Sequence, residues 1–506
     1  VPLPGMKRPN LVRWLAGILL VVLGTFVLAA TRASETRRMV SSGDCTLSVL
    51  TAEPAATPPR GSVLILHGLV ANGKLMDYYT RGFLNAGLRV IVPDFPGHGA
   101  SPPPFSFERA EACGEQFLRE GIRTGGIDPA RTVILGHSLG GAIGLRIASR
   151  IPVAGVVALS PAPMLPVEGA SPEALFYRAP ERLPESSLIL EGSSELPVMH
   201  RAAQALITLL PHGVAKFQVI PWASHSSLLF DAQALRASVD WTATALHLPT
   251  GSPLPNRAVY AGFAAGALGV LLLIGATVRL IPPLPQLTEP APRLPALLPY
   301  VEIAAATTLA MLLVRFTGPL KLVAAYSADY LTTVVAASGC LLLLLNYRLL
   351  RRLGPYSLAT SLSCALAGVL GSFLFFGWLR VSIASSGLSF ARLWRMCVVF
   401  LGVIPICLAE ELLLGPAGAT AWARARRLAQ GMLLRGVAWL ILVAGVFHLH
   451  TRQVLLVIIV PYLAAFSLLQ RLGVDLARRH TGSGLGAAFF GAILTAVFLV
   501  LVFPLT

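Results

Sequence analysis

Long apolar runs constrain this chain more than any other feature of its sequence. The first covers residues 11–30, and eight more follow near 257–279, 296–315, 329–347, 358–379, 395–414, 432–449, 453–470 and 484–505. Each run is long enough to cross a bilayer as a helix, which takes about 20 residues. Only 13% of the residues are charged, and the mean hydropathy is +0.70. The sequence therefore excludes a wholly soluble chain and a disordered one, and it predicts a multi-pass membrane protein.

A polar segment separates the first apolar run from the others. Residues 40–249 carry 15 Lys and Arg against 17 Asp and Glu, a net charge of −2, whereas the rest of the chain has a net charge of +18. Basic residues around spans are typical of short cytoplasmic loops. Because the polar segment has no dense basic stripe, we expect no nucleic-acid partner. We divide the chain into an N-terminal anchor at 1–39, a polar domain at 40–249 and a transmembrane domain of about eight helices at 250–506.

The basic loops predict the orientation in the membrane. The richest three are the loops with Arg348, Arg351 and Arg352, with Arg424, Arg426, Arg427 and Arg435, and with Arg471, Arg478 and Arg479. With nine spans and a cytoplasmic N-terminus, all three lie in the cytoplasm. The polar domain then lies on the other side of the membrane, which we take to be a bacterial inner membrane. One loop disagrees with this count, because it places Arg380, Arg392 and Arg395 outside.

Two features of this topology stay open. Leu28-Ala29-Ala30 supplies small residues that suit cleavage of a signal peptide, but the first run is longer than a typical signal core and favours an uncleaved anchor. Cys45 and Cys113 have no metal-type spacing. Outside the cytoplasm they are able to form a disulfide, and the sequence does not decide whether they do.

The polar domain alternates between two patterns. Short runs of β-branched and apolar residues predict strands at 62–66, 88–92, 132–135, 153–159, 187–190 and 216–220. Between them, amphipathic stretches predict helices at 75–86, 107–121, 139–150, 198–210 and 227–246. This alternation predicts an α/β fold with a doubly wound, mostly parallel sheet. Ligands of such sheets bind beyond the carboxyl ends of the strands.

The strongest motif lies at such a strand end. Gly136-His-Ser-Leu-Gly140 follows the strand at 132–135 and precedes a helix. The pattern G-x-S-x-G in this context places Ser138 on a sharp turn as a nucleophile and leaves the N–H of Leu139 available to an oxyanion. A plain tight turn is the alternative interpretation.

A serine nucleophile needs a base and an acid, which follow it along the chain in this type of fold. His225 lies in the loop after the strand at 216–220, and Glu195 lies in the loop after the strand at 187–190. We prefer Glu195 to Glu191, because Glu191 is still at the strand end. Leu69, in the loop after the strand at 62–66, supplies the second oxyanion N–H. This chemistry requires no metal and no organic cofactor.

Five ordered motifs resemble the α/β-hydrolase superfamily, in particular its serine aminopeptidase-like and monoglyceride-lipase-like branches. They are Leu66-His-Gly, Asp94-Phe-Pro-Gly-His-Gly-Ala-Ser101, Gly136-His-Ser-Leu-Gly-Gly141, Gly192-x-x-Glu195 and Ala223-Ser-His-Ser-Ser-Leu-Leu-Phe-Asp231. The resemblance implies a Ser138–His225–Glu195 triad with oxyanion donors at Leu69 and Leu139. Many relatives insert a helical cap before the acid, whereas only residues 160–186 stand there in this chain. We therefore expect an open site.

A weaker resemblance concerns the membrane half. Ionisable groups inside a span indicate function by default, and Leu408-Ala-Glu-Glu-Leu-Leu-Leu-Gly415 and Gly445-Val-Phe-His448 resemble motifs of the CAAX-protease and bacteriocin-processing family. That family uses glutamates and histidines to activate a metal-bound water. It has an arginine where Gly415 stands here, so a degenerate relative or unrelated helices are favoured. The sequence leaves open whether Glu410, Glu411 and His448 form any site, and we expect no metal.

The sequence thus predicts a membrane-anchored serine hydrolase that cleaves carboxylic esters, with a small-molecule or lipid ester and the bilayer as partners. Two alternatives stay open. One is a serine peptidase of the aminopeptidase-like branch, because sequence does not separate amide from ester hydrolysis. The other is a transporter or scaffold whose hydrolase-like domain only senses a ligand. The substrate, any protein partner and the oligomeric state are not encoded in these motifs.

Overall fold

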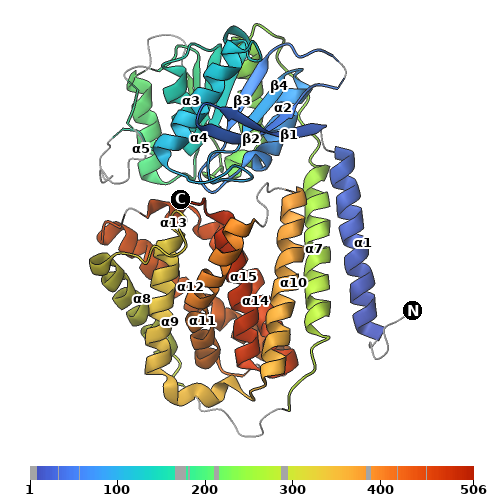
Figure 1. Cartoon of the computed structure of the whole chain (residues 1–506), viewed down its shortest axis with the longest axis vertical. Coiled ribbons are helices and arrows are strands. Elements are labelled where there is room, and N and C mark those ends of the chain that lie inside the picture. Colours follow the sequence, from blue (N-terminus) through green and yellow to red (C-terminus); the bar gives the residue numbers. More distant parts are fainter. Residues whose placement is uncertain are drawn as a thin grey trace. The chain divides into compact units, whose positions relative to one another are not determined.

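The chain forms two compact units (Figure 1). One is built mainly from Ala29–Val259, and the other from Val1–Leu28, Tyr260–Leu379 and Leu388–Phe503. The computed structural model describes residues 8–31, 34–55, 57–165, 178–180, 183–209, 216–285, 294–382, 389–416, 418, 420–451 and 453–506. We refer to the two units as the α/β unit and the helical unit.

The α/β unit contains one eight-stranded sheet with the order β1-β2-β4-β3-β5-β6-β7-β8. The strands are β1 (Glu35–Ser42), β2 (Cys45–Ala52), β3 (Ser62–Leu66), β4 (Arg89–Pro93), β5 (Thr132–His137), β6 (Gly155–Leu159), β7 (Ser187–Gly192) and β8 (Lys216–Ile220). β2 is antiparallel to β1 and to β4, and every other pair is parallel. The predicted α/β fold with a mostly parallel sheet is confirmed, and all six predicted strands are present.

The sequence did not indicate β1 and β2. β1 reads Glu-Thr-Arg-Arg-Met-Val-Ser-Ser, and most of its residues are exposed because it is the edge strand of the sheet. A polar edge strand lacks the apolar signature of the buried strands. As a result, β1 begins at Glu35 and crosses the boundary that composition placed at residue 40.

Helices and short 3-10 turns connect the strands. They are η1 (Gly73–Met76), α2 (Asp77–Asn85), α3 (Phe107–Arg123), η2 (Pro129–Arg131), α4 (Leu139–Ala148), α5 (Pro197–Leu206), η4 (Ile207–Leu209), η5 (Ser227–Phe230) and α6 (Ala232–Ala245). Two of the α-helices begin at side-chain caps: in α3, Ser106 accepts from the Arg109 N–H, and in α6, Asp231 accepts from the N–H groups of Gln233 and Ala234. Each such cap stabilises its helix by about 1 kcal/mol.

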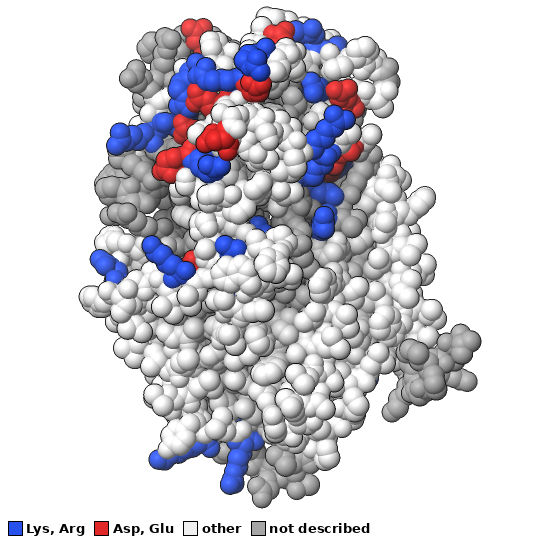
Figure 2. Space-filling model, viewed as in Figure 1, with Lys and Arg blue, Asp and Glu red and all other residues white. Residues whose placement is uncertain are grey.

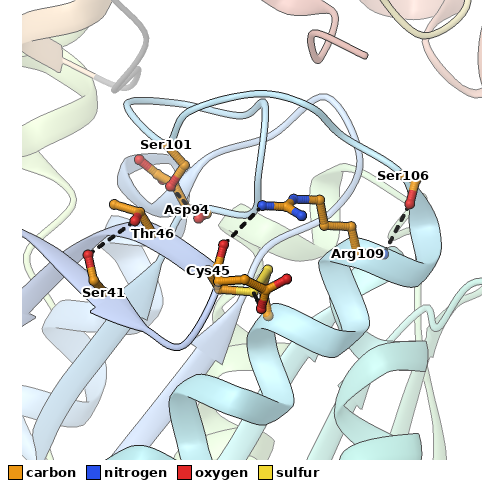
Figure 3. The surroundings of a disulfide bond; sticks show 9 residues. Ser41, Cys45, Thr46, Asp94, Ser101, Ser106 and Arg109 are labelled. Carbon is orange, nitrogen blue, oxygen red and sulfur yellow. Dashed lines mark hydrogen bonds between the residues drawn. A yellow bond between two sulfur atoms is a disulfide. The ribbon is translucent and has the colours of Figure 1, made fainter.

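A disulfide joins Cys45 at the start of β2 to Cys113 in α3, with the Cα atoms 5.4 Å apart (Figure 3). Both cysteines are buried. Next to the disulfide, an Arg109 Nη2–H donates to the main-chain oxygen of Asp44 at 3.2 Å, and Ser41 and Thr46 share a hydrogen bond of 3.1 Å. The pairing that the sequence left open is therefore formed in the structure, and it ties the antiparallel edge of the sheet to a covering helix.

The helical unit consists of α1 (Arg8–Thr31), α7 (Ala258–Val278), α8 (Leu298–Thr317), α9 (Ala328–Leu345), η6 (Tyr347–Leu353), α10 (Leu358–Ser382), α11 (Phe390–Leu414), α12 (Ala421–His448), α13 (Val454–Ile458), α14 (Val460–Thr481) and α15 (Gly484–Val502). Among the described residues, eight helices are long and apolar enough to cross a membrane, namely α1, α7 to α12 and α15. Figure 2 shows a broad surface without charged residues over these helices. A multi-pass membrane protein is compatible with these findings.

The span expected at 453–470 is not among these eight. The chain forms the short α13 and then α14 in this region. The second half of α14 carries Arg471, Asp475 and Arg478, and these charged residues lower the mean hydropathy of the helix. Nevertheless α14 runs antiparallel to α12. Arg427 binds Asp475 at 2.9 Å, and a later residue of α12, Arg435, binds the main-chain oxygen of an earlier residue of α14, Ser467, at 2.8 Å. α14 therefore brings the chain back toward the end where α12 begins.

The three basic loops of the sequence meet at that end of the helical unit. Arg352 in η6 donates to the Leu413 oxygen at the end of α11 at 3.2 Å, and Arg478 near the end of α14 donates to the Arg352 oxygen at 2.6 Å. Arg427, in the first half of α12, binds Glu411 in the last turn of α11 at 2.8 Å. The loops that the nine-span count places on one side are thus adjacent in space.

Candidate active site

Ser138 occupies a sharp turn between β5 and α4. Its φ of +54° lies in the left-handed region, which a residue with a side chain rarely adopts. The turn is tight because Gly140 lets the helix approach the neighbouring strand: a Cβ on Gly140 would lie 2.1 Å from the Leu66 oxygen. A non-glycine residue at 140 would push these backbones apart. The turn therefore has the form of a nucleophile elbow, with Ser138 beyond the carboxyl end of β5.

The loop after β3 lies directly against this turn. A Cβ on Gly68 would lie 3.3 Å from Ser138 Cβ and 2.8 Å from His137 Nδ1, so only glycine fits between them. The adjacent Leu69 and the first residue of α4, Leu139, are the predicted oxyanion donors. Neither of their N–H groups donates a hydrogen bond to any residue that the structure describes. Both are therefore available to an incoming oxyanion.

His67 holds this loop in place. Its Nδ1–H donates to the Gly68 oxygen at 2.8 Å, and its Nε2 accepts from the Phe95 N–H at 2.9 Å. Burial lowers the pKa of His67, more than the nearby Asp94 raises it. The ring is thus neutral, which is the state that has one donor and one acceptor. His67 connects the loops after β3 and β4.

His225 and Glu195 form a hydrogen-bonded pair. His225 lies between β8 and η5, and its Nδ1 is 3.0 Å from Glu195 Oε2. Their loops are also joined, because the Ser194 N–H donates to the Ala223 oxygen at 2.8 Å. Burial raises the pKa of Glu195, but the hydrogen bond and charge of His225, with smaller contributions from Ser160 and the Leu196 N–H, hold that pKa below its usual value. Glu195 is therefore ionised and orients the imidazole with Nδ1 protonated.

His137 connects this pair to the serine turn. The ring of this residue, which directly precedes Ser138, donates from Nε2 to the His225 oxygen at 2.8 Å. The two imidazole rings are 5.0 Å apart between centroids. Ser138 and His225 share no hydrogen bond in the part of the chain that the structure describes. Catalytic hydrogen bonds are often long or poorly aligned without substrate, so this geometry is compatible with a serine–histidine pair that forms its bond when substrate is present.

Glu191 lies behind Glu195, fully buried at the end of β7. Its Oε2 accepts from Ser160 Oγ at 3.4 Å. Burial, followed by the negative charge of Glu195, raises the pKa of Glu191 to about 9. This residue is therefore a neutral carboxylic acid near pH 7. Sequence analysis set Glu191 aside as the triad acid because of its position at the strand end. The raised pKa of Glu191 could not be predicted from the sequence.

A family model described as "Alpha/beta hydrolase family" matches residues 63–478. The chain belongs to this family. It is 36% identical over 140 residues to the 30 kDa subunit of magnesium chelatase from Rhodobacter capsulatus, a match that covers 26% of this chain and 43% of that protein. The chain therefore spans less than half the length of that curated relative.

Solved structures with similar chains include two hydrolases. A predicted CIB-like hydrolase from Thermoplasma acidophilum is 19% identical, with 41% of this chain and 98% of that chain covered and a TM-score of 0.34. A monoacylglycerol lipase from Paleococcus ferrophilus is 22% identical, with 39% of this chain and 99% of that chain covered and a TM-score of 0.32.

Asp94 joins several segments of the α/β unit, and sequence analysis assigned it no role. It is completely buried after β4, and it accepts hydrogen bonds from the N–H groups of Gly73 at 2.7 Å and Ala100 at 3.1 Å. Arg37 of β1 reaches it with an ion pair of 2.7 Å. Asp94 therefore fixes the loop after β4, against which His67 also packs. Its place in the Asp94–Ser101 motif was the only sequence signal.

In the helical unit, Glu410 and Glu411 bind arginines. Arg435 makes two hydrogen bonds of 2.7 Å to Glu410, and Arg471 binds Glu411 at 2.6 Å. His448 follows Arg435 by 13 residues on α12, which at about 1.5 Å per residue places it about 20 Å away. Among the described residues, no group of three or more His, Cys, Asp or Glu side chains is placed to hold a metal ion. The arrangement that the CAAX-protease resemblance implies is therefore not formed here.

The connection between β6 and β7, where many relatives have a cap, is described only in part. Residues 166–177 and 181–182 lie outside the described residues, and with them the expectation of an open site. Ser160, at the start of the connection, belongs to the site through its contact with Glu191. The fold supports a hydrolase, and the residues described above are its candidate active site.

Proposed function

We propose that the chain is a membrane-anchored serine hydrolase that cleaves carboxylic esters, with Ser138 as nucleophile, His225 as base and Glu195 as the acid. The observation that carries this proposal is the 3.0 Å bond between His225 Nδ1 and Glu195 Oε2, in a loop held to the turn that displays Ser138. Because Nδ1 of His225 donates its proton to the hydrogen bond with Glu195, Nε2 of His225 is the nitrogen that accepts a proton from Ser138.

The proposed mechanism is acyl transfer. His225 takes the proton of Ser138 as the hydroxyl oxygen attacks the ester carbonyl, and the N–H groups of Leu69 and Leu139 bind the oxyanion of the tetrahedral intermediate. Each oxyanion donor contributes roughly 3–4 kcal/mol in other hydrolases. Collapse expels the alcohol, which receives the proton from His225. Water then attacks the acyl-enzyme by the same route and regenerates Ser138.

We also propose that the α/β unit lies outside the cytoplasm. The Cys45–Cys113 disulfide favours this, because structural disulfides form in oxidising compartments. The three basic loops meet at one end of the helical unit, which agrees with a cytoplasmic face at that end. Because α14 runs antiparallel to α12, counting α14 as a crossing keeps the number of crossings odd. An uncleaved α1 completes this topology.

Labelling of the full chain with a fluorophosphonate probe tests the activity. We expect labelling of the wild type, none of Ser138→Ala, and normal labelling of Ser149→Ala, a matched control at the end of α4. A panel of esters, acylglycerols and peptides then separates an esterase from a peptidase. A folded wild-type chain that stays unlabelled, or esterase activity that survives Ser138→Ala, would refute the proposal. The first result would favour a sensing domain, and the second would assign the activity to residues other than Ser138.

A further inference from the structure

A cavity of about 140 Å³ lies among α8, α9, α11, α12, α14 and α15 of the helical unit and is partly open to the surface. Most of its wall is apolar, formed by side chains such as Val334, Ile406, Leu442, Leu463 and Phe498. None of the candidate catalytic residues lines it. A cavity of similar size in another protein, about 150 Å³, admits benzene, so this one has room for about six to eight carbon atoms.

The polar part of the wall is small and contains opposite charges. Glu410 and Arg435 face each other there with two hydrogen bonds of 2.7 Å. Arg435 also binds Gln470 Oε1 at 2.6 Å. Because the carboxylate and the guanidinium already neutralise each other, a charged ligand would lose its hydration without gaining a counter-charge. The cavity therefore favours an uncharged polar group.

The hydrogen-bonding groups of this polar part suit a hydroxyl. Gln470 Nε2 carries two N–H groups and donates one to Thr495 Oγ1 at 3.4 Å, while Thr495 itself donates to the Gly491 oxygen at 3.0 Å. Gln470 is thus a donor, whereas the carboxylate of Glu410 and the oxygen of Thr495 are acceptors. A ligand hydroxyl is both a donor and an acceptor, and it satisfies both kinds of partner at once.

We propose that this cavity binds the hydroxyl-bearing end of an uncharged alcohol with an alkyl chain. The hydroxyl lies among Glu410, Gln470 and Thr495, and the chain lies along the apolar wall. The lining residues of α12 run from Arg435 to Leu442, a length of about 10 Å at about 1.5 Å per residue. The site is separate from Ser138, so it exists whether or not the chain hydrolyses esters.

Photolabelling of the full chain in lipid nanodiscs tests this proposal. The probe is an octanol that carries a diazirine and a terminal alkyne. Leu442 lines the cavity and is 3% exposed, whereas Leu440 on the same helix is 71% exposed. We expect Leu442→Trp to reduce labelling at least fivefold by filling the cavity, and Leu440→Trp to change it less than twofold. Equal labelling of the two variants would overturn the proposal.

Competition and a second variant test the role of the hydroxyl. We expect unlabelled octanol to compete at least fivefold better than octane or octanoate against the wild type, and Thr495→Val to remove most of the advantage over octane. Thr495→Val keeps the shape of the side chain, so its folding is expected to be normal. Octane that competes as well as octanol would overturn the assignment of an alcohol. Ser138→Ala is expected to label like the wild type, which keeps this result independent of the proposed hydrolase activity.

Discussion

His137 donates a hydrogen bond of 2.8 Å to the main chain of His225, a residue 88 positions further along the sequence. The bond joins the residue before the proposed nucleophile to the residue proposed as base. Burial, more than any other influence, lowers the pKa of His137 to about 3. The ring is therefore neutral near pH 7, and titration of His137 does not break the bond there.

Replacing His137 tests whether this bond positions the base. The variant His137→Phe keeps a ring of similar size but leaves the His225 oxygen without its donor. Loss of a buried hydrogen bond costs about 1–3 kcal/mol, so we expect kcat/KM for an ester to fall roughly 10- to 100-fold. His200→Phe, on α5, serves as the control and should have full activity. If His137→Phe is fully active, the bond has no positioning role.

Replacing Glu195 tests the identity of the acid. We expect Glu195→Gln to lower kcat by about 10²- to 10⁴-fold, because an amide neither stabilises the imidazolium nor fixes its tautomer. The matched control is Glu191→Gln, the same substitution four residues earlier, which should lose less than threefold because the wild-type side chain is already uncharged. Steady-state kinetics on one ester measure both variants. The opposite result would make Glu191 the acid.

Glu191 also predicts a pH dependence of stability. Its pKa rises from a usual 4.5 to about 9 on folding, first through burial and then through Glu195. Between these pH values the unfolded chain loses the proton of this carboxyl group while the folded chain keeps it. The contribution of Glu191 to the free energy of unfolding is therefore fully present below pH 4.5 and decreases as the pH rises to 9.

Glu191→Gln removes this titration. We expect the melting temperature of the variant to exceed that of the wild type by roughly 5 °C or more at pH 8, at about 2–4 °C per kcal/mol for a unit of this size. The difference should shrink toward pH 5. Thermal melts of the full chain across this range provide the measurement. A difference between variant and wild type that does not change with pH would show that Glu191 is ionised in the folded state.

The sequence predicted the sheet and the position of each candidate catalytic residue because these depend on local signals. Buried parallel strands have dense β-branched runs, and the turn at Ser138 requires glycines at fixed spacing. β1 escaped prediction because an exposed edge strand has no apolar pattern. The roles of Asp94 and His137 depend on partners far away in sequence, which local patterns do not reveal.

In the helical unit, the sequence predicted nine spans, whereas eight helices of the described residues are long and apolar enough to cross a membrane. α14 was expected at 453–470, but it extends to Thr481 because Arg471 is buried against Glu411 and Asp475 rather than exposed to lipid. Hydropathy counts each charge as unfavourable, whereas a charge paired inside a bundle costs far less. Glu410 and Glu411, which the sequence left without an assigned site, are paired in the same way with Arg435 and Arg471.

The disulfide provides the last prediction. Cys45 and Cys113 close a loop with a sequence separation of 68, for which chain entropy predicts a contribution of about 4 kcal/mol to the stability of the folded unit. We therefore expect Cys113→Ser to lower the melting temperature of the α/β unit by at least 8 °C, at about 2–4 °C per kcal/mol. The control Cys340→Ser, which removes an exposed free thiol, should leave the melting temperature unchanged.

Maleimide labelling of the denatured chain, isolated from the membrane without reductant, should modify two cysteines fewer than after reduction. An equal count in both samples would show that the pair is reduced in the cell, and would contradict an extracytoplasmic α/β unit.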